Sequence, residues 1–176
     1  MSGRVTFVLG GARSGKSRYA EGLIAAAPPP WIYVATAEAL DEEMRQRIAE
    51  HRARRGDGWR TVEAPCDLAE ALAGLPPTAA VLIDCVTLWL SNLLLAEADT
   101  DAEIDRLEAA LAQMQGTVVL VANEVGCGIV PDNALARRFR DLQGRANQRL
   151  AARADHLVLM VAGQPLFVKG QPKDLP

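Results

Sequence analysis

The sequence lacks an excess of positive charge. Its 176 residues carry 19 Lys and Arg against 22 Asp and Glu, a formal net charge of −3 at pH 7. A domain that binds nucleic acid is expected to present a basic face that neutralises phosphates. We therefore expect no nucleic-acid partner.

Paired cysteines and long apolar runs are also missing. Cys66, Cys85 and Cys127 are odd in number and far apart, without the spacing of a zinc site or a disulfide framework. Reduced thiols and a cytoplasmic location are expected. The longest apolar stretch, Val81–Ala96, is broken by polar residues, and the first apolar run has only strand length. We expect neither a signal peptide nor a membrane span.

What the sequence does contain is an alternation of short apolar runs with longer segments of helical periodicity. This pattern predicts an α/β fold with a mainly parallel sheet and helices on both faces, because both faces of each strand are apolar. The expected strands are Val5–Leu9, Trp31–Ala35, Ala80–Asp84, Thr117–Val121 and Leu157–Val161. The chain length fits a single domain covering residues 1–176.

Several further segments are predicted from turn residues and periodicity. Gly163-Gln164-Pro165 indicates a turn into a possible antiparallel edge strand at Leu166–Val168. Leu40–Arg54 has acids four residues before bases, as in the pairs Asp41/Arg45, Glu43/Arg47 and Glu50/Arg54, which is typical of a solvated helix. Asp101–Met114 has one apolar stripe, as does a later helix, on which a solvated face is expected at Arg145, Asn147, Gln148 and Arg149.

One motif carries a specific chemical prediction. The segment Gly10-Gly11-Ala12-Arg13-Ser14-Gly15-Lys16-Ser17 matches the phosphate-binding pattern G-x-x-x-x-G-K-[ST] and lies between a predicted strand and a predicted helix. Its glycines let backbone N–H groups point into one concavity. Lys16 is expected to reach the β- and γ-phosphates, and the Ser17 hydroxyl to ligate Mg²⁺. The motif predicts binding of a nucleoside triphosphate as a substrate.

Asp84 ends the predicted strand Ala80–Asp84, as expected for a carboxylate that holds magnesium directly or through water. The two histidines are harder to interpret. His51 shares a helix face with Met44 and Ile48, a spacing that favours a partly buried helix histidine. His156 resembles an ordinary residue at the start of a strand.

The loop Asn123-Glu124-Val125-Gly126 follows a predicted strand at the edge where open α/β proteins bind ligands. A polar loop without function fits it equally well.

Six segments together resemble one known family. They are GGARSGKS (10–17), YVATAEALDEEM (33–44), RIAEHRARRGDGWRTVE (47–63), LIDCVTLWLSNLL (82–94), NEVGCGIVPDN (123–133) and FRDLQGRANQRL (139–150). In this order, across almost the whole chain, they closely resemble the bifunctional adenosylcobinamide kinase/adenosylcobinamide-phosphate guanylyltransferase family. The phosphate loop occurs in many NTPases, whereas the His51 segment and the NEVG loop are much more specific.

The resemblance implies a P-loop NTPase-like fold and two reactions. Adenosylcobinamide, a corrinoid, would be phosphorylated by a nucleoside triphosphate such as ATP or GTP with Mg²⁺. GMP would then pass from GTP to the new phosphate through a covalent GMP-histidine at His51. The family's nucleotide contacts fall on Gly10–Ser17 and on Ala35, Thr36, Ala37, Arg52, Ala53, Arg54, Arg55, Glu63 and Asp84.

The resemblance also suggests a homotrimer. Gly56 departs from the family, in which many relatives carry proline, but this change removes no reactive group. Two other functions stay open: a P-loop small-molecule kinase without nucleotidyl transfer, and a non-catalytic nucleotide switch that needs a protein partner.

Overall fold

The fold is seen in a computed structural model that describes residues 4–39 and 41–171, without the side chains of Glu43, Arg47 and Arg54. The strands are β1 (Val5–Gly10), β2 (Trp31–Ala35), β3 (Trp59–Glu63), β4 (Ala80–Asp84), β5 (Val118–Asn123), β6 (His156–Val161) and β7 (Gln164–Lys169). The helices are α1 (Lys16–Ala25), α2 (Glu42–Arg54), α3 (Leu68–Ala73), α4 (Val86–Leu95), α5 (Thr100–Gln113) and α6 (Ala134–Arg153).

The strands of the described chain form one sheet in the order β3-β2-β4-β5-β1-β6-β7. All neighbouring strands are parallel except β6 and β7, which are antiparallel. The prediction of a mainly parallel sheet with an antiparallel edge strand near the C-terminus is therefore confirmed. Because β5 lies between β1 and β4, the carboxyl ends of these three strands meet at one edge of the sheet.

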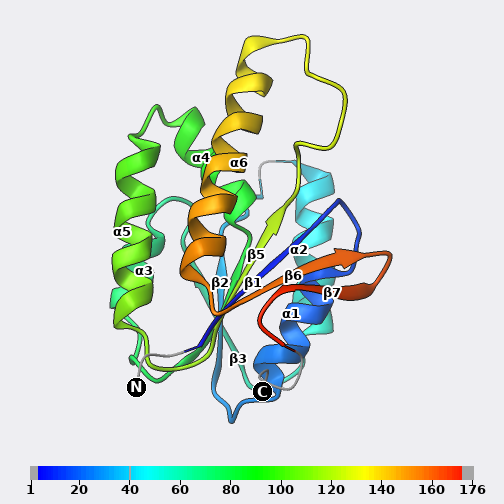
Figure 1. The fold of residues 1–176 in the computed structure, drawn as a ribbon. Coiled ribbons are helices and arrows are strands. Elements are labelled where there is room, and N and C mark those ends of the chain that lie inside the picture. The colour runs from blue at the N-terminus through cyan, green and yellow to red at the C-terminus, as the bar shows by residue number, and fades with distance from the viewer. Residues whose placement is uncertain (1–3, 40, 172–176) are drawn as a thin grey trace.

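Helices cover both faces of the sheet, as the apolar strands predicted. Figure 1 shows α1 and α2 on one side and α3 to α6 on the other. Alternate strand residues feed two cores: Phe7 packs toward α3 to α6, whereas the next residue, Val8, packs toward α1. Both side chains are fully buried. Burial on both faces explains why the strands have no polar alternation.

Three elements were not predicted as a strand or helix, namely β3, the short helix α3 and the helix α4. β3 has polar Arg60, Thr61 and Glu63 among its residues, because it is an edge strand with much of its surface exposed. The helix α4 lies inside the apolar stretch Val81–Ala96, where periodicity alone does not separate a strand from a helix. The boundary is set by Cys85, whose sulfur accepts a hydrogen bond from the backbone of the first turn.

The start of α2 differs from the predicted pairing of charges. Asp41 caps the helix by accepting a hydrogen bond from the Met44 N–H at 2.7 Å, so Arg45 pairs with Glu42 instead. A cap satisfies a backbone donor that has no partner within the helix. Other predictions in this segment lie outside the described residues or side chains: Leu40 and the pairs Glu43/Arg47 and Glu50/Arg54.

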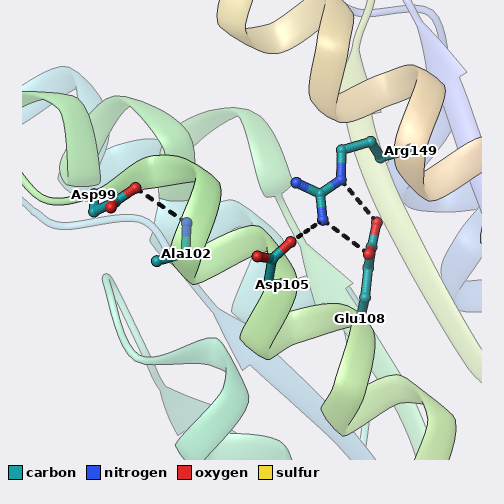
Figure 2. A network of polar contacts seen from close by, with 5 residues as sticks. All are labelled: Asp99, Ala102, Asp105, Glu108 and Arg149. Atoms are coloured by element: carbon teal, nitrogen blue, oxygen red, sulfur yellow. Dashed lines mark hydrogen bonds and ion pairs between the residues drawn. The ribbon is translucent and has the colours of Figure 1, made fainter.

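A charged network joins α5 to α6 (Figure 2). Arg149 on α6 donates to both carboxylate oxygens of Glu108, at 3.0 and 2.8 Å, and to Asp105 one turn earlier on α5. The predicted solvated face of α6 is thus only partly correct. Arg145 and Gln148 are exposed, but Arg149 is half-buried in this network and Asn147 is buried.

We expect Arg149→Met to lower the free energy of unfolding by about 1 kcal/mol, because it removes a bidentate pair that connects two helices. Urea unfolding followed by circular dichroism measures the change. Arg106→Met is the matched control, since the ion pair of Arg106 with Glu103 lies within one helix. An equal loss in both variants would show that the connection between α5 and α6 adds nothing.

Candidate active site

The phosphate loop connects β1 to α1 and has the backbone that its glycines allow. Gly15, the residue before α1, has φ of 94°, in the left-handed region that glycine adopts without strain. A Cβ on Gly10 would lie 2.6 Å from Ser14 Oγ and 2.7 Å from Met160 O, so a larger residue does not fit there. Because α1 begins directly after this loop, its first N–H groups have no partner within the helix. Such N–H groups at a helix N-terminus attract anions.

Polar side chains of the loop are held close to its backbone. Lys16 Nζ donates to Gly11 O at 2.6 Å, which keeps the ammonium group inside the loop's curve. The Ser14 hydroxyl is buried and has no hydrogen-bond partner within the described chain. A buried hydroxyl without a partner is costly, so this atom fits a site that a ligand completes.

Asp84 lies at the same edge of the sheet as this loop. It ends β4, where it is level with Val121 of β5 and Ala35 of β2. Its Oδ2 is buried without a hydrogen-bond partner among the residues described. Together with Ser17, the carboxylate provides the oxygen ligands that Mg²⁺ prefers.

These residues suit magnesium bound together with a triphosphate better than a metal held by the protein alone. Within residues 4–39 and 41–171, no cluster of three or more His, Cys, Asp or Glu side chains could hold a metal ion. Mg²⁺ usually keeps several waters and binds one or two protein oxygens plus substrate phosphates. Ser17 and Asp84 are the residues that would hold it.

A cavity of about 920 Å³ contains most of the predicted site. It is lined by the loop residues Ala12 to Ser17, by the chain after β2, by one side of α2, and by the ends of β3, β4 and β5. Segments far apart in the sequence thus meet because parallel strands end at one edge. The volume is in the range of small-molecule sites.

His51 lines this cavity from α2. Met44 and Ile48 line it from the same helix, at the spacing that puts all three side chains on one face. His51 is half-buried. The structure therefore brings the predicted histidine, Lys16 and Asp84 to one cavity, whereas His156 is buried at the start of β6 and does not line it.

The helix α2 is attached to the sheet by few contacts. None of its described side chains is buried. Arg52 forms an exposed ion pair with Glu63 at the end of β3, at 3.0 Å, and Arg55 lies over the ring of Tyr33, 3.4 Å from its centroid. A stacked guanidinium is a favourable but local contact. The described residues of this helix take part in neither of the two cores that the other helices help to form.

The remaining predicted contacts divide into two groups. Ala35 and Ala37 line the cavity, as do Arg52, Arg55 and Glu63. Gly10, Gly11, Thr36 and Ala53 do not line it, and the side chain of Arg54 lies outside the described part of the chain. Thr36 is fully buried, with its hydroxyl bonded to the backbone of Cys85.

The NEVG loop contributes one residue to the cavity. Asn123, the last residue of β5, lines it, whereas the Glu124 carboxylate accepts a hydrogen bond from the Gly126 N–H of its own loop at 2.6 Å. Thr87 accepts from the Asn123 N–H at 2.7 Å, which ties the loop to α4. The order of strands, which the sequence does not give, decides that Asn123 lies beside the phosphate loop.

Other cavity residues were missed by the sequence analysis. Tyr33, Cys85, Thr87 and Leu88 all line it. Each lies within four residues of a predicted site residue, and that closeness was the only available signal. Which side of a strand faces the cavity depends on the packing of the whole sheet.

Cys85 is a cavity residue that is not suited to be a nucleophile. Burial, helped by the nearby Asp84 carboxylate, raises the pKa of its thiol to about 12. The thiolate is the reactive form of cysteine. At neutral pH the thiol is therefore protonated, and its sulfur already accepts the Leu88 N–H at 3.5 Å.

The fold and the loop together define a P-loop nucleotide-binding protein of the α/β class. Solved structures share this fold. The RadB recombinase matches with a TM-score of 0.52 and 16% identity, over 90% of this chain and 74% of that one. A type III secretion system ATPase of pathogenic bacteria matches with a TM-score of 0.57 and 12% identity, over 90% of this chain and 52% of that one.

The family is defined by much stronger matches. Residues 6–168 match the model of the family described as cobinamide kinase / cobinamide phosphate guanyltransferase. The bifunctional adenosylcobalamin biosynthesis protein CobP of Pseudomonas aeruginosa is 46% identical, over 94% of this chain and 97% of the relative. The bifunctional adenosylcobalamin biosynthesis protein CobU of Salmonella typhimurium is 47% identical, over 92% of this chain and 98% of the relative. The chain belongs to this family.

The resemblance seen in the sequence is therefore confirmed. No helix in the described part of the chain has the length and apolar character needed to cross a membrane.

We expect iodoacetamide at pH 8 to label the exposed Cys127 but not Cys85 in the folded protein. A rise in pKa from an ordinary value near 9 to about 12 lowers the thiolate fraction of Cys85 roughly a thousandfold at this pH. Labelling should rise only as the pH approaches 12. Mass spectrometry of peptides measures the extent of labelling at each cysteine, and urea-unfolded protein is the control. Equal labelling of both cysteines in the folded protein would contradict the prediction.

Proposed function

We propose that this chain phosphorylates adenosylcobinamide with a nucleoside triphosphate and then transfers GMP from GTP onto the new phosphate through a covalent GMP on His51. Membership of the family supports the two activities. The observation that carries the covalent step is that His51 faces the cavity that also contains the phosphate loop and Asp84. Both reactions would use one catalytic domain.

The kinase step transfers the γ-phosphoryl group of ATP or GTP. The corrinoid hydroxyl oxygen attacks the γ-phosphorus, the bond to the β–γ bridging oxygen breaks, and the nucleoside diphosphate leaves while the hydroxyl proton is lost. Lys16 and the N–H groups of the loop neutralise charge on the β- and γ-phosphates. Bound Mg²⁺, held by Ser17 and Asp84, would supply further neutralisation of phosphate charge.

The guanylyl step requires a nucleophile on the protein. A neutral imidazole nitrogen of His51 attacks the α-phosphorus of GTP, and the bond to the α–β bridging oxygen breaks with loss of pyrophosphate. A phosphate oxygen of the phosphorylated corrinoid then attacks the same phosphorus, the P–N bond breaks, and adenosylcobinamide-GDP is released. Such covalent capture divides one difficult transfer into two easier ones. Arg52 and Arg55, which line the same cavity, can neutralise charge at the α-phosphate.

His51 is the best nucleophile among the cavity residues. The neutral imidazole ring of a histidine has a ring nitrogen with a free lone pair, which can attack phosphorus. Cys85 stays protonated for the reason given above, and Lys16 is occupied by the loop backbone.

We expect His51→Asn to abolish the covalent GMP and guanylyl transfer, while phosphorylation of adenosylcobinamide survives in part. The kinase step needs the loop and Mg²⁺ but no protein nucleophile. Asparagine keeps a similar size and a hydrogen-bonding side chain, so the variant tests chemistry rather than packing. Intact-protein mass spectrometry after incubation with GTP and Mg²⁺ measures the adduct, and product formation measures each reaction.

Lys16→Ala is the control that should depress both reactions, because the same loop serves each. Protein-bound GMP in His51→Asn, or a wild-type adduct on another residue, would overturn the assignment. A wild-type protein that phosphorylates the corrinoid but never forms an adduct would favour the plain kinase.

The two reactions also demand different geometry, since one occurs at the γ-phosphorus and the other at the α-phosphorus. We therefore expect α2, with its few contacts to the sheet, to move when GTP binds. Hydrogen–deuterium exchange should be faster in α2 than in α1 without nucleotide, and GTP should slow it several-fold in α2 alone. The same position of α2 in free and GTP-treated structures, with His51 already at the α-phosphate, would refute this motion.

A further inference from the structure

Thr36, the first residue after β2, has its side chain entirely within the protein. Its hydroxyl forms two hydrogen bonds with Cys85, the residue that follows the neighbouring strand β4. It donates to Cys85 O at 2.7 Å and accepts from Cys85 N–H at 2.8 Å. One hydroxyl thus bonds to both backbone groups of Cys85: it is the partner of the N–H, and it shares the carbonyl oxygen with the Trp89 N–H, which donates to that oxygen at 3.2 Å. Buried backbone groups require such partners, because leaving one unpaired is costly.

The bonds of Thr36 hold the peptide group that follows Asp84. The Thr36 backbone N–H donates to Asp84 O at 3.4 Å, and the Thr36 hydroxyl accepts the N–H of the same peptide. By holding this peptide, Thr36 fixes the ψ angle of Asp84 and the position of the main chain from which the carboxylate projects. Thr36 does so without touching the carboxylate, whose Oδ2 has no hydrogen-bond partner among the described residues.

Asn92 completes the arrangement from α4. Its side-chain amide donates to Thr36 O and to Pro65 O, both at 2.9 Å, so it joins the ends of β2 and β3. Cys85 caps α4, and Asn92 lies seven residues later, two turns along the same helix side. Thr36 is therefore bonded on one side to Cys85, which follows β4, and on the other to Asn92 of α4.

We propose that Thr36 is a positioning residue, which directs the Asp84 carboxylate toward magnesium bound to the triphosphate, and that Asn92 supports it. The inference rests on the proposed metal-binding role of Asp84. It differs from a direct nucleotide contact by Thr36, which would need the hydroxyl in the cavity rather than on Cys85. Partners that orient a metal-binding side chain commonly affect metal affinity although they do not touch the ion.

The test compares nucleotide binding with and without magnesium. The probe is the α,β-methylene analogue of GTP, whose α–β bond His51 cannot cleave, and the dissociation constant is measured by calorimetry in Mg²⁺ or in EDTA. Thr36→Val keeps the shape but removes the hydroxyl. It should weaken binding about tenfold in Mg²⁺ and leave binding in EDTA unchanged. Thr36→Ser, which restores the hydroxyl, should bind within about twofold of wild type in both conditions.

A double-mutant cycle shows whether Thr36 acts through Asp84. Asp84→Asn should weaken binding in Mg²⁺ at least as much as Thr36→Val, and the double variant should be no weaker than Asp84→Asn alone. Additive losses, or an equal loss in Mg²⁺ and EDTA, would overturn the proposal. If Thr36→Val fails to fold, Asn92→Ala carries the same test, with an expected Mg²⁺-specific loss of about threefold. If Asn92→Ala weakened binding equally in Mg²⁺ and in EDTA, this result would also overturn the proposal.

The outcomes separate the proposed metal-binding role of Asp84 from its positioning by Thr36. Wild-type binding by Asp84→Asn would refute the metal-binding role of Asp84. An effect of Asp84→Asn without one of Thr36→Val would leave that role intact and refute positioning by Thr36.

Discussion

The site depends on the position of β5 between β1 and β4. The carboxyl ends of parallel strands all lie at the same edge of the sheet. This edge therefore holds the loop after β1, the carboxylate at the end of β4 and the loop after β5. A phosphate site needs backbone N–H groups and a metal-binding oxygen within the length of one triphosphate. The order of these three strands brings the phosphate loop and the Asp84 carboxylate to one edge, which suits the triphosphate and Mg²⁺ that we propose, and the buried apolar faces hold the strands in place.

This rigid edge contrasts with the helix that carries His51. The described side chains of α2 are half-buried or exposed, whereas α4 and α5 bury Trp89, Leu107 and other large residues. Elements with few buried contacts open and shift at lower free-energy cost than core elements. The molecule thus combines a phosphate loop anchored in the buried sheet with a helix outside both cores, and His51, the nucleophile that we propose, lies on that helix.

Buried and half-buried polar groups near the site follow a common pattern. Thr36, Asn92 and Thr87 bond to the backbone of neighbouring strand ends rather than to one another. Each replaces the water that a strand end would otherwise bind, because such ends leave N–H and C=O groups without ladder partners. Burying a polar side chain costs free energy unless it is hydrogen-bonded. Here these hydrogen bonds hold the strand ends that carry the predicted site residues.

The phosphate loop, the predicted strands β1, β2, β4, β5 and β6, and the edge strand β7 followed from local chemistry: glycine freedom, continuous apolar runs and turn residues, all of which act within a few residues. The sequence also determined the family, through motifs spread over most of the chain. Local pattern did not reveal β3, which is polar because it is an edge strand, or the division of the apolar stretch 81–96 into β4 and α4. Residue spacing also could not distinguish a His51 packed in the core from a His51 that faces a cavity. It could not show that the Thr36 hydroxyl bonds to the backbone of Cys85. Only the tertiary structure decided these points, because they depend on which strands are neighbours and which side of each element is covered.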